Sequence, residues 1–406
     1  MAPSRKKRKL RRNTHHHVKY KKHNTSLLMA ASTSSRSNQP HVASFDTLPL
    51  ECRILIFSFL SDWDKCTAST VSKSWFFTIR SPILWQTVDF TTFSVDTRDE
   101  FYKDYVQTAL APLDWKGHVL YCFNCYKKRL EHYARYLRSV KASVKHLRFQ
   151  FDLGHPEDQF GKMLINVLRG VNCRNLVALD AMWSQTLCRP LMPHPSDYFP
   201  PYESPPLGKV KAFQEFLKVL VAAAPNLRQA MLPFDWSFES TSLLTQFRYL
   251  TELHLKYYWI FSVLSQEQLT ALLKGLTHLK KFTLQLRNRI TPGSLHELQY
   301  TMESKSIQLL DISGCQGFFL RGMNMPQLQR IWVSRPRWSG PLIILNEHSF
   351  IPRCVYYVLV EGAPALKVIN SYRLEENWTR GLSGELHRTL RHACSCQKHL
   401  NSWALM

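Results

Sequence analysis

The chain has 406 residues, of which 45% are hydrophobic, and a formal net charge of +23 at pH 7. This length and composition allow a sizeable core and more than one domain, which excludes a wholly disordered chain. The longest apolar stretches, such as 219–224, are far too short to span a bilayer, so no membrane-spanning helix is expected. Ten scattered cysteines, with no apolar segment after the basic N-terminus, indicate a reducing compartment, nuclear or cytoplasmic.

The positive charge is concentrated at the N-terminus. Eleven Lys or Arg and no Asp or Glu lie between Met1 and Phe45. A block of like charge repels itself and buries little surface, so we expect residues 1–43 to form a disordered basic tail. Its core resembles a nuclear localisation signal and comprises Arg5, Lys6, Lys7, Arg8 and Lys9. The alternatives are a solvated tail and a tail that contacts nucleic acid through counterion release.

Three short helices are predicted over residues 44–90. Pro49 suits the first turn of a helix, and apolar residues follow it at helical spacing over an unusually wide face. Ser61 or Asp62 can cap a second helix over about 63–70, and a third helix should end near Ile79. Such short helices cannot bury so many large apolar side chains alone, so this segment is expected to bind a partner.

The same segment resembles the F-box family. The resemblance is carried by Leu48-Pro49-x-Glu51, Ile54-x-x-Phe57-Ser58-Phe59-Leu60, Asp64-Lys65-Cys66, Val71-Ser72-Lys73-x-Trp75 and Pro82-x-Leu84-Trp85, in the family's order and spacing. Lys65 stands where an aliphatic residue is common, which puts the contact made by the second helix in doubt. The resemblance implies a Skp-family adaptor and a cullin scaffold as partners. The residues implied in the adaptor interface, or in the small core beneath it, are Leu48, Pro49, Ile54, Leu60, Val71 and Trp75.

A repeated phrase follows a helical linker predicted over 91–143. Eight phrases with spacing similar to L-x-x-L-x-L begin at residues 144, 176, 227, 250, 279, 307, 328 and 366, and helical stretches are predicted at 159–169, 210–223, 266–274 and 292–302. A strand and a helix in each stacked unit are typical of leucine-rich repeats. We therefore predict an α/β chain with an irregular leucine-rich-repeat solenoid over 144–375, interrupted by a proline-rich insertion at 189–208. Residues 376–406 are expected to be a cap or tail. An ordinary α/β domain is the alternative.

The sequence contains no motif for a catalytic nucleophile or a phosphate-binding loop, so we expect no enzyme active site and no cofactor. Cys122 and Cys125 have a zinc-like spacing, and Cys394 and Cys396 lie near several histidines. Neither group supplies four ligands at the usual spacing, so we predict no metal site.

An F-box followed by leucine-rich repeats implies a substrate-recognition subunit of an SCF-type ubiquitin ligase. The F-box would bind the adaptor, and the repeats would bind an unknown target protein. Strand residues Lys256, Lys281, Arg330 and Trp332 are predicted to face an acidic or phosphorylated substrate. The alternatives are a non-degradative nuclear scaffold and a nucleic-acid-associated protein that uses the basic tail.

Overall fold

The computed structural model describes residues 45–93, 128–151, 159–183, 207–257, 264–288, 298–334 and 353–394. The chain divides into two compact units, Met1–Thr47 and Leu48–Met406. Only the short 3-10 helix η1 (Phe45–Thr47) is described in the first unit, and all other described elements belong to the second. The predicted basic tail, residues 94–127 of the predicted helical linker and the insertion up to residue 206 lie outside the described residues.

The three predicted helices are present as α1 (Leu50–Ser58), α2 (Asp62–Ala68) and α3 (Lys73–Ile79). Pro49 precedes α1, as expected for a residue without an amide donor. The Ser61 hydroxyl accepts a hydrogen bond from the Asp64 amide at 3.1 Å, and the Ser72 hydroxyl accepts one from the Trp75 amide at 3.2 Å. Both N-caps satisfy amides that the helix itself leaves unpaired. The 3-10 helices η2 (Pro82–Trp85) and η3 (Phe90–Phe93) flank strand β1.

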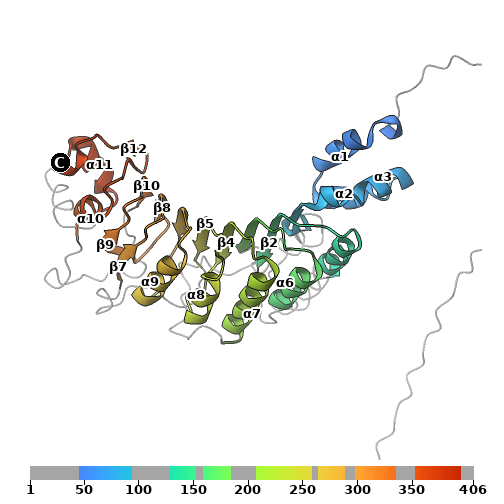
Figure 1. Ribbon diagram of the computed structural model, residues 1–406, viewed down its shortest axis with the longest axis horizontal. Coiled ribbons are helices and arrows are strands. Elements are labelled where there is room, and N and C mark those ends of the chain that lie inside the picture. The colour runs from blue at the N-terminus through green and yellow to red at the C-terminus, as the bar shows by residue number, and fades with distance from the viewer. Residues whose placement is uncertain are drawn as a thin grey trace, which may run out of the picture. The chain divides into compact units, whose positions relative to one another are not determined.

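A ten-stranded sheet continues from β1, and each of the eight sequence phrases supplies one strand to it (Figure 1). The order is β1-β2-β3-β4-β5-β6-β8-β10-β11-β12, and every pair is parallel except β11 and β12. The strands are β1 (Thr87–Asp89), β2 (His146–Phe151), β3 (Ala178–Trp183), β4 (Gln229–Pro233), β5 (Glu252–Lys256), β6 (Lys281–Leu284), β8 (Leu309–Asp311), β10 (Arg330–Trp332), β11 (Val368–Ile369) and β12 (Tyr372–Arg373).

The apolar residues of the phrases form continuous buried rows across the sheet. One row pairs in register from Val88 on β1 to Ile369 on β11. Its members are Val88, Leu147, Leu179, Ala230, Leu253, Phe282, Leu310, Ile331 and Ile369, and all are buried. Because side chains alternate along a strand, the residues on either side of this row lie on the opposite, open face of the sheet.

The start of each strand is joined to its neighbour by the same hydrogen-bond pattern. The Lys145 carbonyl accepts from two consecutive amides, Val177 at 2.8 Å and Ala178 at 3.0 Å. Carbonyls that also accept from two consecutive amides of the next strand segment belong to Gln86, Val177, Arg228, Thr251, Lys280, Gln308 and Gln329. The repetition shows that the strand segments are equivalent units although their spacing in sequence varies.

The second layer consists of elements that connect the strands. Its helices are α6 (Gln159–Gly170), α7 (Leu207–Ala223), α8 (Phe238–Leu244), α9 (Gln266–Gly275) and α10 (Val355–Gly362), of which α6 to α9 lie along one side of the sheet in Figure 1. A further helix covers residues 128–139. The predicted helices at 159–169, 210–223 and 266–274 are confirmed. Helix α8 was not predicted.

The helix predicted at 292–302 is wrong over its described part. Strand β7 (Gln299–Glu303) occupies it and pairs in parallel with β9 (Phe319–Asn324) in a separate two-stranded sheet. Tyr300 and Met302 alternate with more exposed neighbours, which is the two-residue period of a strand.

The C-terminal part of the described chain comprises β12, the 3-10 helix η7 (Trp378–Arg380) and α11 (Gly384–Arg391). Antiparallel β12 covers the edge that β11 would otherwise expose. The Tyr356 hydroxyl of α10 donates to the Trp378 carbonyl at 3.1 Å, and Leu386 and Leu390 of α11 are buried. These contacts are consistent with a closing element at the end of the sheet.

Candidate functional site

The three N-terminal helices share a small core. Phe57 of α1 is 1% exposed and meets the Trp75 ring of α3 edge-on, with a centroid distance of 5.1 Å. The Arg53 guanidinium donates to the Ser74 hydroxyl at 2.9 Å and so ties α1 to α3 a second time. Trp85 is fully buried, and its indole nitrogen donates to the Ile79 carbonyl at 2.7 Å. The helices are therefore fixed to one another by few side chains.

Most of their large apolar side chains remain exposed. Of the fourteen large hydrophobic residues that are exposed in the described chain, ten lie between residues 48 and 83: Leu48, Leu50, Leu55, Ile56, Phe59, Trp63, Val71, Phe76, Phe77 and Ile83. Phe59 is 81% exposed and Phe77 is 72% exposed. Exposed apolar patches of this kind mark interaction sites, because burying them against a partner releases about 25 cal/mol per Å². We refer to these ten residues as the apolar surface.

Residues 45–91 match the F-box-like family. This segment is an F-box-like domain. The match supports an F-box protein and binding to a Skp-family adaptor. No curated protein matches the chain.

The structure places the six predicted adaptor contacts in two groups. Leu48, Pro49 and Val71 are exposed in the F-box-like domain, whereas Ile54, Leu60 and Trp75 are half-buried in it. The ring of Trp75 lies against Phe57, so this residue contributes to the domain core. Their role in adaptor binding stays a prediction.

The most exposed apolar residues, Phe59 and Phe77, were not among the predicted contacts. The signal that could have found them is the presence of neighbouring large apolar residues in α1 and α3, at 54–57 with Phe59 and at 75–77. Neighbouring residues of a helix point to different sides, and a helix in a three-helix unit can bury only one side. The sequence indicated a wide apolar face but not which of its residues point to solvent.

Lys65 has an internal role that its sequence position did not suggest. Its side chain is 7% exposed, and the ammonium group lies 3.1 Å from the Asp62 carboxylate and 3.2 Å from the Leu84 carbonyl. It also lies over the Trp85 ring, 5.2 Å from its centroid. A buried ammonium group needs such partners, because desolvating an unpaired charge is costly.

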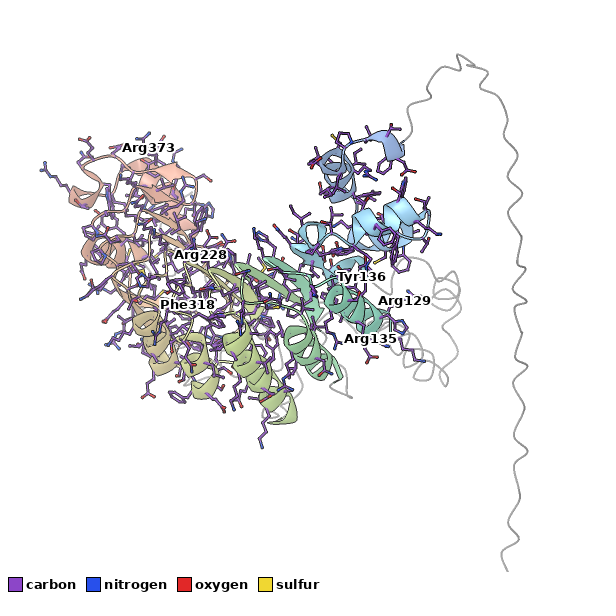
Figure 2. All side chains as sticks on the ribbon, turned by 45° about the vertical axis from the view of Figure 1, so that its right-hand side comes forward. Arg129, Arg135, Tyr136, Arg228, Phe318 and Arg373 are labelled. Atoms are coloured by element: carbon purple, nitrogen blue, oxygen red, sulfur yellow. The ribbon has the colours of Figure 1, made fainter. Side chains whose placement is uncertain are left out.

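The Asp62 carboxylate joins α2 to β1 and to the helix at 128–139. Its Oδ2 atom accepts from the Asp89 amide at 2.7 Å and from the Tyr133 hydroxyl at 2.5 Å. Tyr133 comes from the helix at 128–139, and its ring packs edge-on against Phe90 and Trp85. The side chains of Asp62, Lys65 and Tyr133 therefore form one buried polar cluster between α2, β1 and this helix. Tyr136, labelled in Figure 2, adds a ring contact to Trp85 at 5.2 Å.

Burial raises the pKa of the Tyr133 hydroxyl well above its usual value, and the neighbouring Asp62 carboxylate raises it further. Burial also raises the pKa of Cys66 to about 11, with Asp62 adding to the effect, so this thiol stays protonated at neutral pH. In this cluster the Asp62 carboxylate lies between the Lys65 ammonium group and two neutral donors, the Asp89 amide and the Tyr133 hydroxyl.

The open face of the sheet is the second candidate surface. Arg148 on β2 lies between two carboxylates, 3.5 Å from Asp89 and 3.2 Å from Asp180. These residues help to line a hollow of about 330 Å³ that extends to Met231 and His254. Burial lowers the pKa of His254, which favours its neutral form. The mixed charge suits recognition of a polar surface.

The structure brings together three of the four predicted substrate contacts. Lys281 and Arg330 pair in the same row on either side of β8, and the Arg330 guanidinium lies 5.4 Å from the Trp332 ring centroid. The Lys281 ammonium is 2.7 Å from the Glu252 carboxylate, which reduces its availability to an anion. Lys256 lies at the opposite, carboxyl end of β5. Substrate binding by these residues stays a prediction.

Other predicted features are only partly described. Among the described residues, no group of three or more His, Cys, Asp or Glu side chains could hold a metal ion. Cys122, Cys125 and Cys396 lie outside the described part of the chain. No helix within the described ranges is long and apolar enough to cross a membrane.

The pKa of Tyr133 leads to a pH-dependent stability prediction. The folded state keeps the Tyr133 phenol protonated at a pH where the unfolded chain releases the proton. The contribution of Tyr133 to the free energy of unfolding is therefore complete below about pH 10 and is lost as the pH rises further. Tyr133→Phe should lower the free energy of unfolding by about 1–3 kcal/mol at neutral pH, because Asp62 loses a donor. The variant should then lose stability less steeply than the wild type above about pH 10.

Urea unfolding at several pH values measures both effects. Tyr249→Phe is the matched control, because Tyr249 is 58% exposed. Equal pH slopes for the wild type and Tyr133→Phe would contradict the assignment.

The apolar surface predicts a loss of adaptor binding on charge insertion. Phe59→Asp combined with Phe77→Asp should weaken binding to a purified Skp adaptor at least about tenfold, because aromatic anchors carry much of an interface's free energy. Since both side chains are exposed, the free energy of unfolding should change by less than about 1 kcal/mol. Phe238→Asp, at a 61% exposed position on α8, is the control and should bind like the wild type. Calorimetric titration measures the affinities, and unchanged binding by the double variant would rule out this surface.

Proposed function

We propose that this chain is a substrate-recognition subunit of an SCF-type ubiquitin ligase. The observation that carries the proposal is the concentration of exposed apolar side chains in the F-box-like domain, which is a surface suited to a permanent partner. In this proposal the Skp adaptor covers the apolar surface and links the chain to a cullin, while the sheet holds a target protein.

The proposed mechanism is proximity. Binding the ligase at one surface and a target at another raises the effective concentration of the target near the ubiquitin-conjugating enzyme. Such a role needs no catalytic side chain in this chain, and we propose that it is not an enzyme. The buried Asp62–Lys65–Tyr133 cluster would help by connecting α2 of the F-box-like domain to β1 and to the helix at 128–139.

We further propose that the sheet and its second layer form an irregular leucine-rich-repeat solenoid. Eight parallel strands arise from eight similar phrases, and their starts share one hydrogen-bond pattern. The irregularity lies in β7, which stands where a helix was predicted, and in its partner strand β9. In this architecture the open face of the sheet, including Lys281, Arg330 and Trp332, would contact the substrate.

The basic tail favours a second candidate function. Eleven Lys or Arg without an acidic residue before position 45 suit nuclear import or non-specific nucleic-acid contact. The chain would then be a nuclear scaffold that binds the adaptor without promoting turnover. We propose nuclear import as the role of Arg5–Lys9, with the cytoplasm as a second location.

Protein turnover separates the two functions. Neighbours of the full chain are identified by proximity crosslinking in cells that carry the wild type, Phe59→Asp/Phe77→Asp or the control Phe238→Asp. Their half-lives are then measured. At least one crosslinked protein should persist longer with the double variant than with the wild type or the control, because it no longer reaches the ligase.

Unchanged half-lives for every crosslinked protein would contradict the degradative role and favour the scaffold. A loss of all crosslinks on removal of residues 1–43, with nuclear entry restored by an added signal, would favour the nucleic-acid-associated alternative.

A further inference from the structure

The amino ends of the parallel strands form a strongly basic edge. We define this basic edge by the turn before each strand together with the strand's start: 143–146, 172–178, 224–229, 247–252, 276–281, 304–309, 325–330 and 363–368. These segments contain nine Lys or Arg and one acidic residue, Glu252. The nine are Lys145, Arg174, Arg228, Arg248, Lys280, Lys281, Lys305, Arg330 and Lys367, and all are exposed.

This edge accounts for most of the net positive charge outside the N-terminus. The chain's formal charge is +23, of which the first 45 residues supply eleven and the basic edge supplies eight. The cations are scattered in sequence from Lys145 to Lys367, and only the parallel pairing of the strands brings them to one edge. Adjacent strands lie about 4.8 Å apart, so the charges form a line that an extended ligand could follow.

Structural roles do not account for these cations. Among the described residues, Lys281 alone of the nine forms an ion pair, with Glu252 at 2.7 Å. Helix C-termini attract cations, but within the described chain the side chains of Arg174, Arg228, Arg248, Lys280 and Lys367 donate no hydrogen bond to a helix carbonyl. The strand-start amides are already paired with carbonyls, so an anion would have to be held by side chains.

A hollow in this edge has the donors that an anion requires. It measures about 380 Å³ and is lined by Lys145, Asn175, Val177, Asn226, Arg228 and Tyr249. Asn175 is positioned by a hydrogen bond to the Ser143 hydroxyl at 3.1 Å, and Asn226 by one to the Arg174 carbonyl at 3.0 Å. Two unpaired cations therefore flank two fixed amides and an exposed phenol. Arg228 is one of the residues labelled in Figure 2.

We propose that the basic edge binds an acidic segment of a protein, with one anionic side chain seated in the Lys145–Arg228 hollow. Charge complementarity selects an anionic ligand. A protein segment is favoured over nucleic acid because Tyr249 is the exposed large aromatic residue in the described edge, whereas single-stranded nucleic acid is bound by stacking on several aromatic rings. Identifying this segment as part of a substrate rests on the proposed ligase function.

The test uses the full chain and three fluorescent probes of matched length: a glutamate-rich peptide, the same peptide with phosphoserines, and oligouridylate. Fluorescence anisotropy measures each affinity. Lys145→Glu combined with Arg228→Glu should weaken binding of the acidic peptide roughly tenfold, equivalent to about 1.4 kcal/mol. Higher salt should weaken wild-type binding. Tighter binding of the phosphorylated peptide would assign the hollow to a phosphate group, and equal binding would assign it to carboxylates.

A matched control separates local from overall charge. Arg129→Glu combined with Lys211→Glu changes the net charge equally, and both positions are exposed on helices, in 128–139 and α7. This variant should bind the peptide like the wild type. Lys145→Gln combined with Arg228→Gln should give an intermediate loss, which keeps the test decisive if charge reversal impairs folding.

Three results would overturn the proposal. The first is an equal loss of peptide affinity in the Arg129→Glu/Lys211→Glu control and in the Lys145→Glu/Arg228→Glu variant. The others are no saturable binding of the peptides to the wild type, and wild-type binding of oligouridylate alone. Skp-adaptor binding is measured on the same proteins and should be unchanged in every variant. Failure of the wild type to bind the adaptor would contradict the ligase function. The peptide affinities would still test binding at the basic edge independently.

Discussion

The Asp62 carboxylate is buried between α2, β1 and the helix at 128–139, and its hydrogen bonds and ion pair hold these three elements together. Lys65 supplies a countercharge at 3.1 Å, the Asp89 amide donates from β1, and Tyr133 donates from the helix at 128–139. Removing one partner of a buried ion pair commonly costs about 3–5 kcal/mol, because it leaves an uncompensated charge. The F-box-like domain is thereby fixed through α2 to the beginning of the sheet. Apolar side chains on the outer side of α1 and α3, such as Leu55 and Phe77, take no part in this junction and remain exposed.

The described chain therefore presents two surfaces of opposite chemistry. The F-box-like domain presents apolar side chains such as Phe59 and Phe77, which favour a stable, largely hydrophobic interface. The sheet presents a mixed open face and an edge with nine exposed cations, which favour reversible, salt-sensitive binding. This division suits an adaptor that stays on one partner and exchanges another. The two surfaces share no residue, so each can be altered without changing the side chains of the other.

Local patterns in the sequence predicted the three helices and the eight sheet strands, because helix caps and the spacing of leucines are properties of short segments. The strand at Gln299–Glu303 was mistaken for a helix, although Tyr300 and Met302 show the alternation of a strand. The role of Lys65 could not be predicted, since one member of its cluster, Tyr133, is 71 residues from Asp62. The basic edge was missed for a similar reason: each segment holds only one or two cations, and strand pairing alone aligns them. Which apolar residues of α1 face solvent also depends on packing with α3.

The central claim is that the exposed side of α1 to α3 is an adaptor interface. Hydrogen–deuterium exchange of the full chain with and without the Skp adaptor tests it directly, because burial of a surface slows the exchange of amides beneath it. Exchange in residues 48–83 should slow when the adaptor binds, and exchange in β4, β5 and β6 should not change. Binding without protection of residues 48–83, or protection confined to the sheet, would contradict it.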